Sequence, residues 1–177
     1  MHERIICAGF GGQGVMLLGK LLTQAGMRSG RHVTWMPSYG AEVRGGTAHS
    51  MIHISDSEIS SPIVSNPTTC IVMNKPSLLK FMDRVERGGL LIINTSMAED
   101  IVEKRATRIA AFPLTKLALE LGNIKVANMI AAGAFVRLKG IFSLQDVLEE
   151  LSNVLPSKKD LVAINKKAVK LGYELIK

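Results

Sequence analysis

The stretch from Ala8 to Val15, AGFGGQGV, carries four glycines directly after the short apolar run RIIC. The spacing of Gly9, Gly11 and Gly14 fits G-x-G-x-x-G, a pattern typical of dinucleotide-binding loops. Glycines in such a loop permit a sharp turn and let a phosphate approach the amides at the start of the next helix. The same spacing also suits a tight turn between a strand and a helix, so both interpretations stay open.

A nicotinamide dinucleotide site needs more than the glycines. An acidic residue about 20 positions further on would hold the ribose. The corresponding segment, residues 33–38, reads VTWMPS and contains no Asp or Glu. Arg31 precedes this segment and is poorly placed to read a 2′-phosphate. These observations disfavour a free-standing dinucleotide-dependent enzyme.

A second polar segment, YGAEVRGGTAHS, spans residues 39–50. Arg44 is followed by Gly45 and Gly46, which suggests a bend that presents a guanidinium group. Arginine suits carboxylates and phosphates because it donates two parallel hydrogen bonds. The alternative is a surface ion pair between Glu42 and Arg44 in a structural loop.

The sequence contains residues for binding but no recognisable reacting group. His49 and His53 lie four apart on a predicted strand, about 13 Å from each other, which is too far for one metal ion. We find no serine elbow, no pair of catalytic carboxylates and no activated cysteine. We therefore predict no catalytic residue and no metal ligand in this chain.

Hydrophobic periodicity predicts strands and helices that alternate early, with helices dominating late. We expect strands at residues 4–8, 32–37, 47–55, 70–74, 89–96 and 107–113, and helices at residues 13–28, 76–85 and 124–138. This order is typical of an α/β fold with a doubly wound, mostly parallel sheet and extra C-terminal helices, in a single domain of residues 1–177. Polar residues fall at the predicted strand ends, where such sheets bind ligands: Ser38, Tyr39, Asn74, Asn94, Thr95 and Ser96.

Composition limits the class of protein. Aromatic residues make up only 5% of the 177 residues, which disfavours an aromatic nucleic-acid platform. Cys7 and Cys70 sit in apolar runs and are interpreted as reduced core residues of a cytoplasmic protein. The apolar segment at residues 126–136 is far too short to span a bilayer. We expect it to be a helix buried against other elements or a second subunit, so a homodimer contact is one option for the isolated chain.

The net charge of +7 is concentrated late in the chain. Residues 157–170 predict an amphipathic helix whose lysines face away from an apolar stripe. A solvated helix face is the simplest interpretation, with an acidic partner subunit or a phosphate-bearing ligand as alternatives. No nucleic-acid-binding signature is present.

Four segments occur in an order that resembles a known family: GFGGQGV at the start, PSYGAEVRGGTAHSMIHIS, ISSP at residues 59–62, and NIKVANMIAAGAF at residues 123–135. Together they resemble the gamma subunit of 2-oxoacid:ferredoxin oxidoreductases, which act on pyruvate, 2-oxoisovalerate or 2-oxoglutarate. The likeness spans nearly the whole chain. Residue by residue, the two glycine motifs correspond to Gly9, Gly11, Gly12, Gln13 and Gly14, and to Tyr39, Gly40, Glu42, Arg44, Gly45 and Gly46.

The resemblance implies a subunit of a complex that decarboxylates a 2-oxoacid, forms an acyl-coenzyme A and passes electrons to ferredoxin or flavodoxin. Thiamine diphosphate, Mg and iron–sulfur clusters would belong to partner subunits: alpha, beta and, in some complexes, a ferredoxin-like delta. The gamma component is associated with coenzyme A at a shared site. We predict its cofactor-binding residues to be Gly9, Gly11, Gly12, Gln13, Gly14, Tyr39, Arg44, Gly45, Gly46 and Asn94.

Among the 2-oxoacids, general resemblance favours 2-oxoglutarate. Two alternatives stay open. One is the related small subunit of indolepyruvate oxidoreductase. The other is a free-standing nucleotide- or flavin-binding protein, which would bind its cofactor without partners.

Overall fold

The computed structural model describes residues 1–38, 47–98, 107–155 and 159–176. Within these ranges the strands are β1 (His2–Gly9), β2 (His32–Ser38), β3 (Ala48–Ser55), β4 (Thr69–Val72), β5 (Leu90–Asn94) and β6 (Arg108–Phe112). The α-helices are α1 (Val15–Arg28), α2 (Lys75–Phe81), α3 (Leu114–Glu120), α4 (Ala127–Lys139), α5 (Leu144–Val154) and α6 (Lys159–Glu174). Two short 3₁₀ turns, Met82–Arg84 and Ile124–Val126, follow α2 and precede α4.

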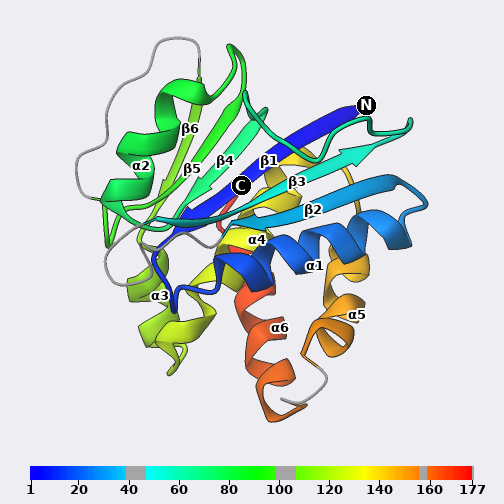
Figure 1. Cartoon of the computed structure of the whole chain (residues 1–177). Helices are drawn as coiled ribbons and strands as arrows, with labels where there is room; N and C mark the ends of the chain where they lie inside the picture. Colours follow the sequence, from blue (N-terminus) through cyan, green and yellow to red (C-terminus); the bar gives the residue numbers. More distant parts are fainter. Residues whose placement is uncertain (39–46, 99–106, 156–158, 177) are drawn as a thin grey trace.

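The strands form one mixed sheet in the order β2-β3-β1-β4-β5-β6 (Figure 1). Strands β1, β4, β5 and β6 are parallel neighbours, whereas β3 is antiparallel to both β1 and β2. Because β1 and β2 both oppose β3, they run in the same direction, and β3 alone is reversed. The α/β class and the mostly parallel sheet predicted from the sequence are confirmed.

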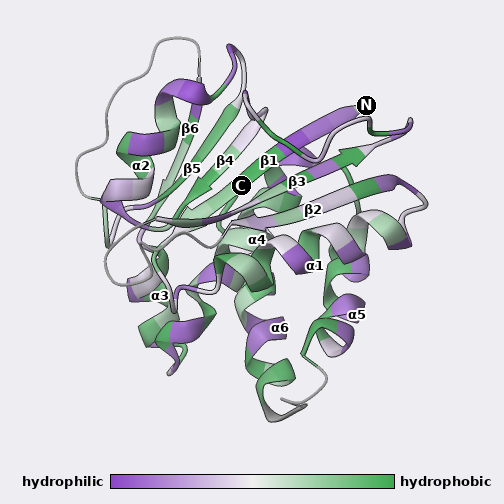
Figure 2. Ribbon diagram, viewed as in Figure 1, coloured by the Kyte–Doolittle hydropathy of each residue, from purple (hydrophilic) through white to green (hydrophobic). Residues whose placement is uncertain are grey.

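Helices cover both faces of the sheet. Helix α2 packs on one face, and α1, α3, α4, α5 and α6 lie on the other (Figure 1). Successive residues of β1 divide between these layers: Ile5 and Cys7 join the core under α1, whereas Ile6 and Ala8 join the core under α2. Hydrophobic residues run along the middle strands, as Figure 2 shows. Burial on both faces explains why these strands read as continuous apolar runs.

The first two strands do not form a simple β-α-β unit of neighbouring strands. The strand–loop–helix–strand order from β1 through α1 to β2 holds, but β1 and β2 are not neighbours, because β3 lies between them. Residues of β3 alternate between the two faces of the sheet: Ile52 and Ile54 lie in the α1 layer, and the His49 ring contacts Phe81 in the α2 layer. Alternation reports which face a residue takes but not which strand is adjacent.

The two cysteines lie in the core, as predicted. Cys7 and Cys70 are fully buried and form no disulfide bond. They belong to opposite layers, since Ile6 rather than Cys7 is the partner of Cys70 in the β1–β4 register. Burial, followed by the neighbouring Cys70, raises the pKa of the Cys7 thiol far above its ordinary value, so Cys7 stays a neutral thiol.

Helices α4 and α6 cross in close contact at two glycines. A Cβ added to Gly133 would lie 1.9 Å from the carbonyl oxygen of Val169, and a Cβ added to Gly172 would lie 1.9 Å from the carbonyl oxygen of Ile130. The backbones therefore touch directly. The predicted burial of residues 126–136 is confirmed, since every residue of this segment is buried. None of the described helices is long and apolar enough to cross a membrane.

Replacing Gly133 with Ala should destabilise the fold, because the added methyl group meets the backbone of α6 rather than a movable side chain. We expect the free energy of unfolding to fall by about 2–3 kcal/mol. Urea denaturation of the chain measures this loss. Lys167→Ala, at an exposed position on α6, is the matched control and should change stability by less than about 0.5 kcal/mol. Equal midpoints for the two variants would contradict the close crossing.

Candidate functional site

Three strand-to-helix connections meet at the carboxyl edge of the sheet (Figure 1). Strand β1 leads through residues 10–14 to α1, β4 leads through Asn74 to α2, and β6 leads through Pro113 to α3. In an open α/β sheet this edge is where ligands bind, because helix starts and strand ends place free backbone groups together. The glycine-rich loop and most of the predicted site residues belong to it.

The side chain of Gln13 closes the glycine-rich loop from inside. Its Oε1 accepts a hydrogen bond from the Phe10 amide at 3.0 Å, and its Nε2 donates to the Met73 carbonyl at 3.0 Å. The loop is thereby tied to the end of β4. Gly9 makes room for this bridge, since a Cβ there would lie 2.5 Å from Gln13 Oε1. Gly9 and Gln13 thus act as a pair in holding the turn.

Asn128 of α4 holds the other end of the loop. Its Nδ2 donates to the Gly14 carbonyl at 2.9 Å, and a Cβ on Gly14 would lie 2.4 Å from this nitrogen. Gly14 is also the N-cap of α1, in a left-handed conformation with φ of 71°. Asn128 is 1% exposed, and its Oδ1 has no hydrogen-bond partner. Close packing inside the protein therefore requires glycine at both ends of the loop.

The middle of the loop faces solvent. Gly11 and Gly12 are exposed, and a Cβ on Gly12 would meet nothing within 4 Å. Gly12 has φ of 101°, a conformation that glycine adopts without strain. This part of the loop, together with the start of α1, is the part open to a ligand. The predicted site residues Gly9, Gln13 and Gly14 lie in the same loop but serve its internal structure.

Asn94 lies at the same edge, with its side chain directed into the protein. The residue is fully buried, and its Nδ2 donates to the Met73 carbonyl and to Thr115 Oγ1. Its Oδ1 accepts from the Thr115 amide at 3.2 Å. A ligand that contacted Asn94 would have to replace these bonds. Asn74 is similarly engaged, because its Oδ1 accepts from the Ser77 amide and caps α2.

The second glycine motif falls outside the described residues. Tyr39, Arg44, Gly45 and Gly46 belong to the range 39–46, which connects β2 to β3. The described residues on either side lie at the edge that carries the glycine-rich loop, since Ser38 pairs with His49 and Ala48 pairs with Gly9. The predictions for these four residues therefore stay predictions.

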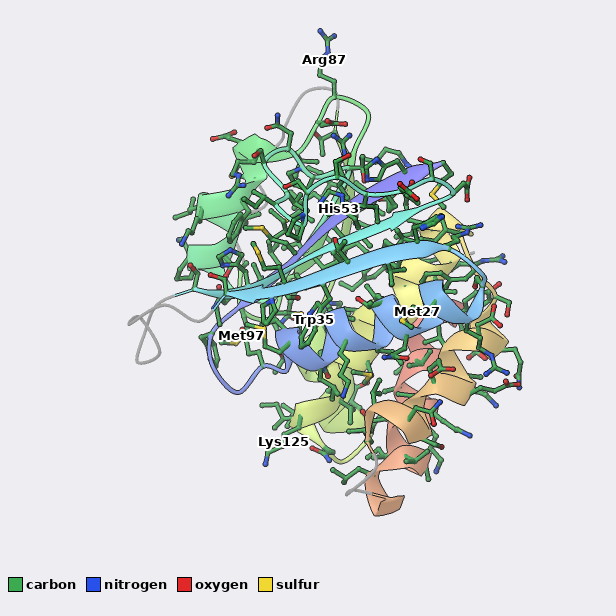
Figure 3. All side chains as sticks on the ribbon, turned by 45° about the vertical axis from the view of Figure 1, so that its right-hand side comes forward. Met27, Trp35, His53, Arg87, Met97 and Lys125 are labelled. Atoms are coloured by element: carbon green, nitrogen blue, oxygen red, sulfur yellow. The ribbon has the colours of Figure 1, made fainter. Side chains whose placement is uncertain are left out.

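Exposed hydrophobic side chains lie at the carboxyl edge of the sheet. Phe10, in the glycine-rich loop, is 37% exposed, and Met97, after β5, is 39% exposed. The Met97 carbonyl accepts from the amide of Lys75 at the start of α2. Figure 3 shows Met97 on the side of the molecule that carries the loop, whereas Arg87 projects at the far end. The open part of the site thus has an apolar border.

Sequence reasoning missed Asn128, which bonds to the glycine-rich loop, and Thr115, which bonds to Asn94. Neither residue belongs to the two glycine motifs. A signal for Asn128 was present: it is a polar residue inside the otherwise apolar stretch VANMIAAGAFV. A buried amide in such a helix needs a hydrogen-bond partner, and here the partner is the Gly14 carbonyl. Thr115 gave no comparable signal.

Residues 4–175 match the family described as pyruvate ferredoxin/flavodoxin oxidoreductase. The chain belongs to this family. The resemblance deduced from the four motifs is therefore confirmed, and the glycine-rich loop lies within the matched residues.

Two curated relatives differ in length. The 2-oxoglutarate synthase subunit KorC of Methanothermobacter marburgensis is 36% identical over 99% of this chain and 97% of its own length. The ketoisovalerate oxidoreductase subunit VorA of the same organism is 35% identical over 97% of this chain. This chain spans only 36% of the length of VorA. The same domain therefore exists both as a short subunit and as part of a longer chain.

Solved structures share the fold. The gamma subunit of a keto/oxoacid ferredoxin oxidoreductase from Geobacter sulfurreducens matches with a TM-score of 0.84 and 26% identity, over 97% of this chain and 96% of that one. A 2-oxoglutarate:ferredoxin oxidoreductase from Magnetococcus marinus, solved with 2-oxoglutarate, coenzyme A and succinyl-CoA bound, matches with a TM-score of 0.87 and 22% identity. That match covers 98% of this chain and 31% of the larger one.

Replacing Gln13 with Ala should loosen the glycine-rich loop, because the Phe10 amide and the Met73 carbonyl both lose their partner. We expect the free energy of unfolding to fall by about 1–2 kcal/mol and the Phe10 amide to exchange hydrogen faster. Thermal unfolding and amide hydrogen exchange measure the two effects. Gln24→Ala, at a half-buried glutamine on α1, is the matched control. Unchanged exchange at Phe10 would show that Gln13 does not hold the loop.

Proposed function

We propose that this chain is the gamma subunit of a 2-oxoacid:ferredoxin oxidoreductase, a complex that converts a 2-oxoacid into an acyl-coenzyme A and transfers electrons to ferredoxin or flavodoxin. Membership of the family over residues 4–175 carries the proposal. The near-complete overlap with the KorC subunit supports it. Thiamine diphosphate, Mg and the iron–sulfur clusters are assigned to alpha, beta and delta partner subunits, in line with the resemblance.

We infer that the open part of the carboxyl edge contributes to a coenzyme A site shared with a partner subunit. When bound, coenzyme A supplies the thiol that accepts the acyl group. The residues present fit an anionic portion of this molecule, because the exposed backbone at Gly11 and Gly12 lies next to the start of α1, whose amides favour negative charge. Arg44 would add a full positive charge from the neighbouring connection. The exposed Phe10 and Met97 suit the apolar contact that a partner subunit needs at such an edge.

The substrate is proposed to be 2-oxoglutarate, and the KorC relatives favour it over 2-oxoisovalerate and pyruvate. The matches to the KorC relatives cover nearly the full length of both chains, whereas the VorA relatives are longer proteins. A panel of 2-oxoacids supplied to the native complex tests this choice. Mass spectrometry of the same complex distinguishes it from indolepyruvate oxidoreductase, which has a different subunit arrangement.

The isolated chain should not turn over any 2-oxoacid, because the cofactors of the reaction are assigned to other subunits. We expect no reduction of a viologen dye when the pure chain is mixed with 2-oxoglutarate, coenzyme A and thiamine diphosphate. Addition of the purified partner subunits should restore the reaction. Dye reduction by the chain alone would refute the assignment of this chain as a gamma subunit.

Arg44→Ala should raise the coenzyme A concentration that the reconstituted complex needs, because one charge-assisted contact is lost. We expect a change of roughly 10- to 150-fold, corresponding to about 1.5–3 kcal/mol. Titration of coenzyme A in the coupled assay measures it, and the melting temperature of the isolated chain should not change. Arg87→Ala, an exposed arginine at the far end of the molecule, is the control (Figure 3). If both variants behave like the wild type, Arg44 is only a solvated loop residue.

A further inference from the structure

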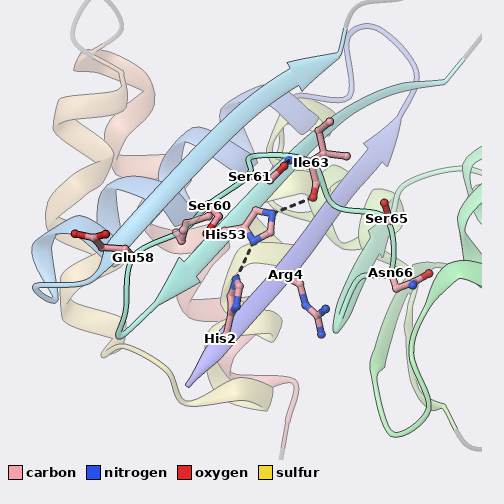
Figure 4. A pocket seen from close by; sticks show the side chains of 10 residues that line it. His2, Arg4, His53, Glu58, Ser60, Ser61, Ile63, Ser65 and Asn66 are labelled. Carbon is pink, nitrogen blue, oxygen red and sulfur yellow. Dashed lines mark hydrogen bonds between the residues drawn. The ribbon is translucent and has the colours of Figure 1, made fainter.

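A pocket lined by both polar and apolar groups lies at the end of β1 that is remote from the glycine-rich loop (Figure 4). It has a volume of about 450 Å³ and sits between the first residues of β1, the end of β3 and the segment of residues 58–66. The β1–β3 register separates the two sites, since His2 pairs with Ser55 at one end and Gly9 pairs with Ala48 at the other. The proposed coenzyme A site does not involve this pocket.

Two histidines form a directional chain of hydrogen bonds in the pocket wall. His53 Nε2 lies 3.3 Å from the Ile63 carbonyl oxygen, which can only accept, so this nitrogen carries a proton. His53 Nδ1 lies 2.9 Å from His2 Nε2. Burial lowers the pKa of His53, and the nearby His2 and Arg4 lower it further against the raising effect of the Ile63 carbonyl. In neutral His53, Nδ1 therefore accepts and His2 Nε2–H donates.

Arg4 supplies a positive charge to the same pocket. One of its terminal nitrogens pairs with Glu86 at 2.8 Å, but its Nε is buried and has no hydrogen-bond partner. A buried guanidinium N–H without an acceptor is costly, so the site favours a ligand that accepts hydrogen bonds. The hydroxyl groups of Ser60 and Ser65 add donors on the segment that forms the opposite wall. Figure 4 shows the carboxylate of Glu58 directed away from the two imidazoles.

The arrangement fits an anion better than a metal ion. His2 and His53 lie close together, but within the described ranges no third His, Cys, Asp or Glu joins them in a cluster that could hold a metal. A guanidinium and several hydroxyl groups are donors that carboxylates and phosphates accept from, and the imidazolium form of His2 adds a donor at Nδ1.

We propose that this pocket binds a small oxyanion, a phosphate or a carboxylate group, through Arg4, His2 and the serine hydroxyl groups of residues 60–65. The ligand group bridges the start of β1 and the segment that covers it. The site is independent of the coenzyme A site at the opposite end of β1, so either can exist without the other.

Titration of the full chain with inorganic phosphate, followed by NMR signals of the imidazoles of His2 and His53, tests the proposal. We expect saturable shifts in the wild type and an affinity lower by roughly tenfold or more in Arg4→Gln. Glu86→Gln is the matched control, because it breaks the same ion pair but leaves the arginine. This variant should bind phosphate as tightly as the wild type or more tightly.

A parallel titration with acetate distinguishes the two ligand groups. Saturation by phosphate alone assigns the site to a phosphorylated ligand, saturation by acetate alone assigns it to a carboxylate, and saturation by both assigns it to oxyanions of either kind. No saturable shift with either anion, or equal affinity in Arg4→Gln and Glu86→Gln, would overturn the proposal. If Arg4→Gln fails to fold, His2→Gln replaces it, because His2 is exposed and its loss should still weaken binding.

Discussion

The position of β1 at the centre of the sheet is the constraint on which the other features depend. A buried carboxylate helps to fix it: Glu3 is 4% exposed and accepts hydrogen bonds from Thr68 and Thr69, which precede and begin β4. Lys139, at the end of α4, pairs with the same carboxylate at 2.8 Å. A charged side chain is stable at such a buried position only when it has partners of this kind. The group therefore joins β1, β4 and the α4 layer at one point, in the strand that leads to both sites.

With β1 held in this way, its two ends face different surroundings. The carboxyl end opens into the glycine-rich loop beside helix starts, where backbone amides are available. The amino end lies under the segment of residues 58–66, which lines the pocket together with His2, Arg4 and His53. The antiparallel direction of β3 contributes to the surroundings of both ends of β1, because it brings Ala48 beside Gly9 and His53 beside Arg4. One antiparallel strand in a parallel sheet thus places residues from either end of the 48–55 segment next to β1.

Local patterns predicted most of the elements, because helix caps and face alternation depend on residues close in sequence. Ser143 and Asp146 form a capping box at the start of α5, and alternating residues of β3 take opposite faces of the sheet. The strand order was not predictable, since β3 enters between β1 and β2 through contacts between distant segments. The pocket was not predictable for the same reason, because its residues come from segments that are distant in the sequence. His2 and His53 are 51 residues apart, and the sequence pattern brought His53 together only with His49.

The glycines of the glycine-rich loop are explained by packing and backbone conformation inside the protein. Gln13 occupies the space beside Gly9, and Asn128 occupies the space beside Gly14, so both glycines are needed whether or not a phosphate binds. Gly12 is needed for its backbone conformation. The motif spacing by itself therefore reports a tightly closed turn. In the proposed coenzyme A site, recognition of the ligand uses a group that the turn leaves free, namely the exposed backbone at Gly11 and Gly12. A closed, internally bonded turn is also the better scaffold for such groups, because their positions are set before a ligand arrives.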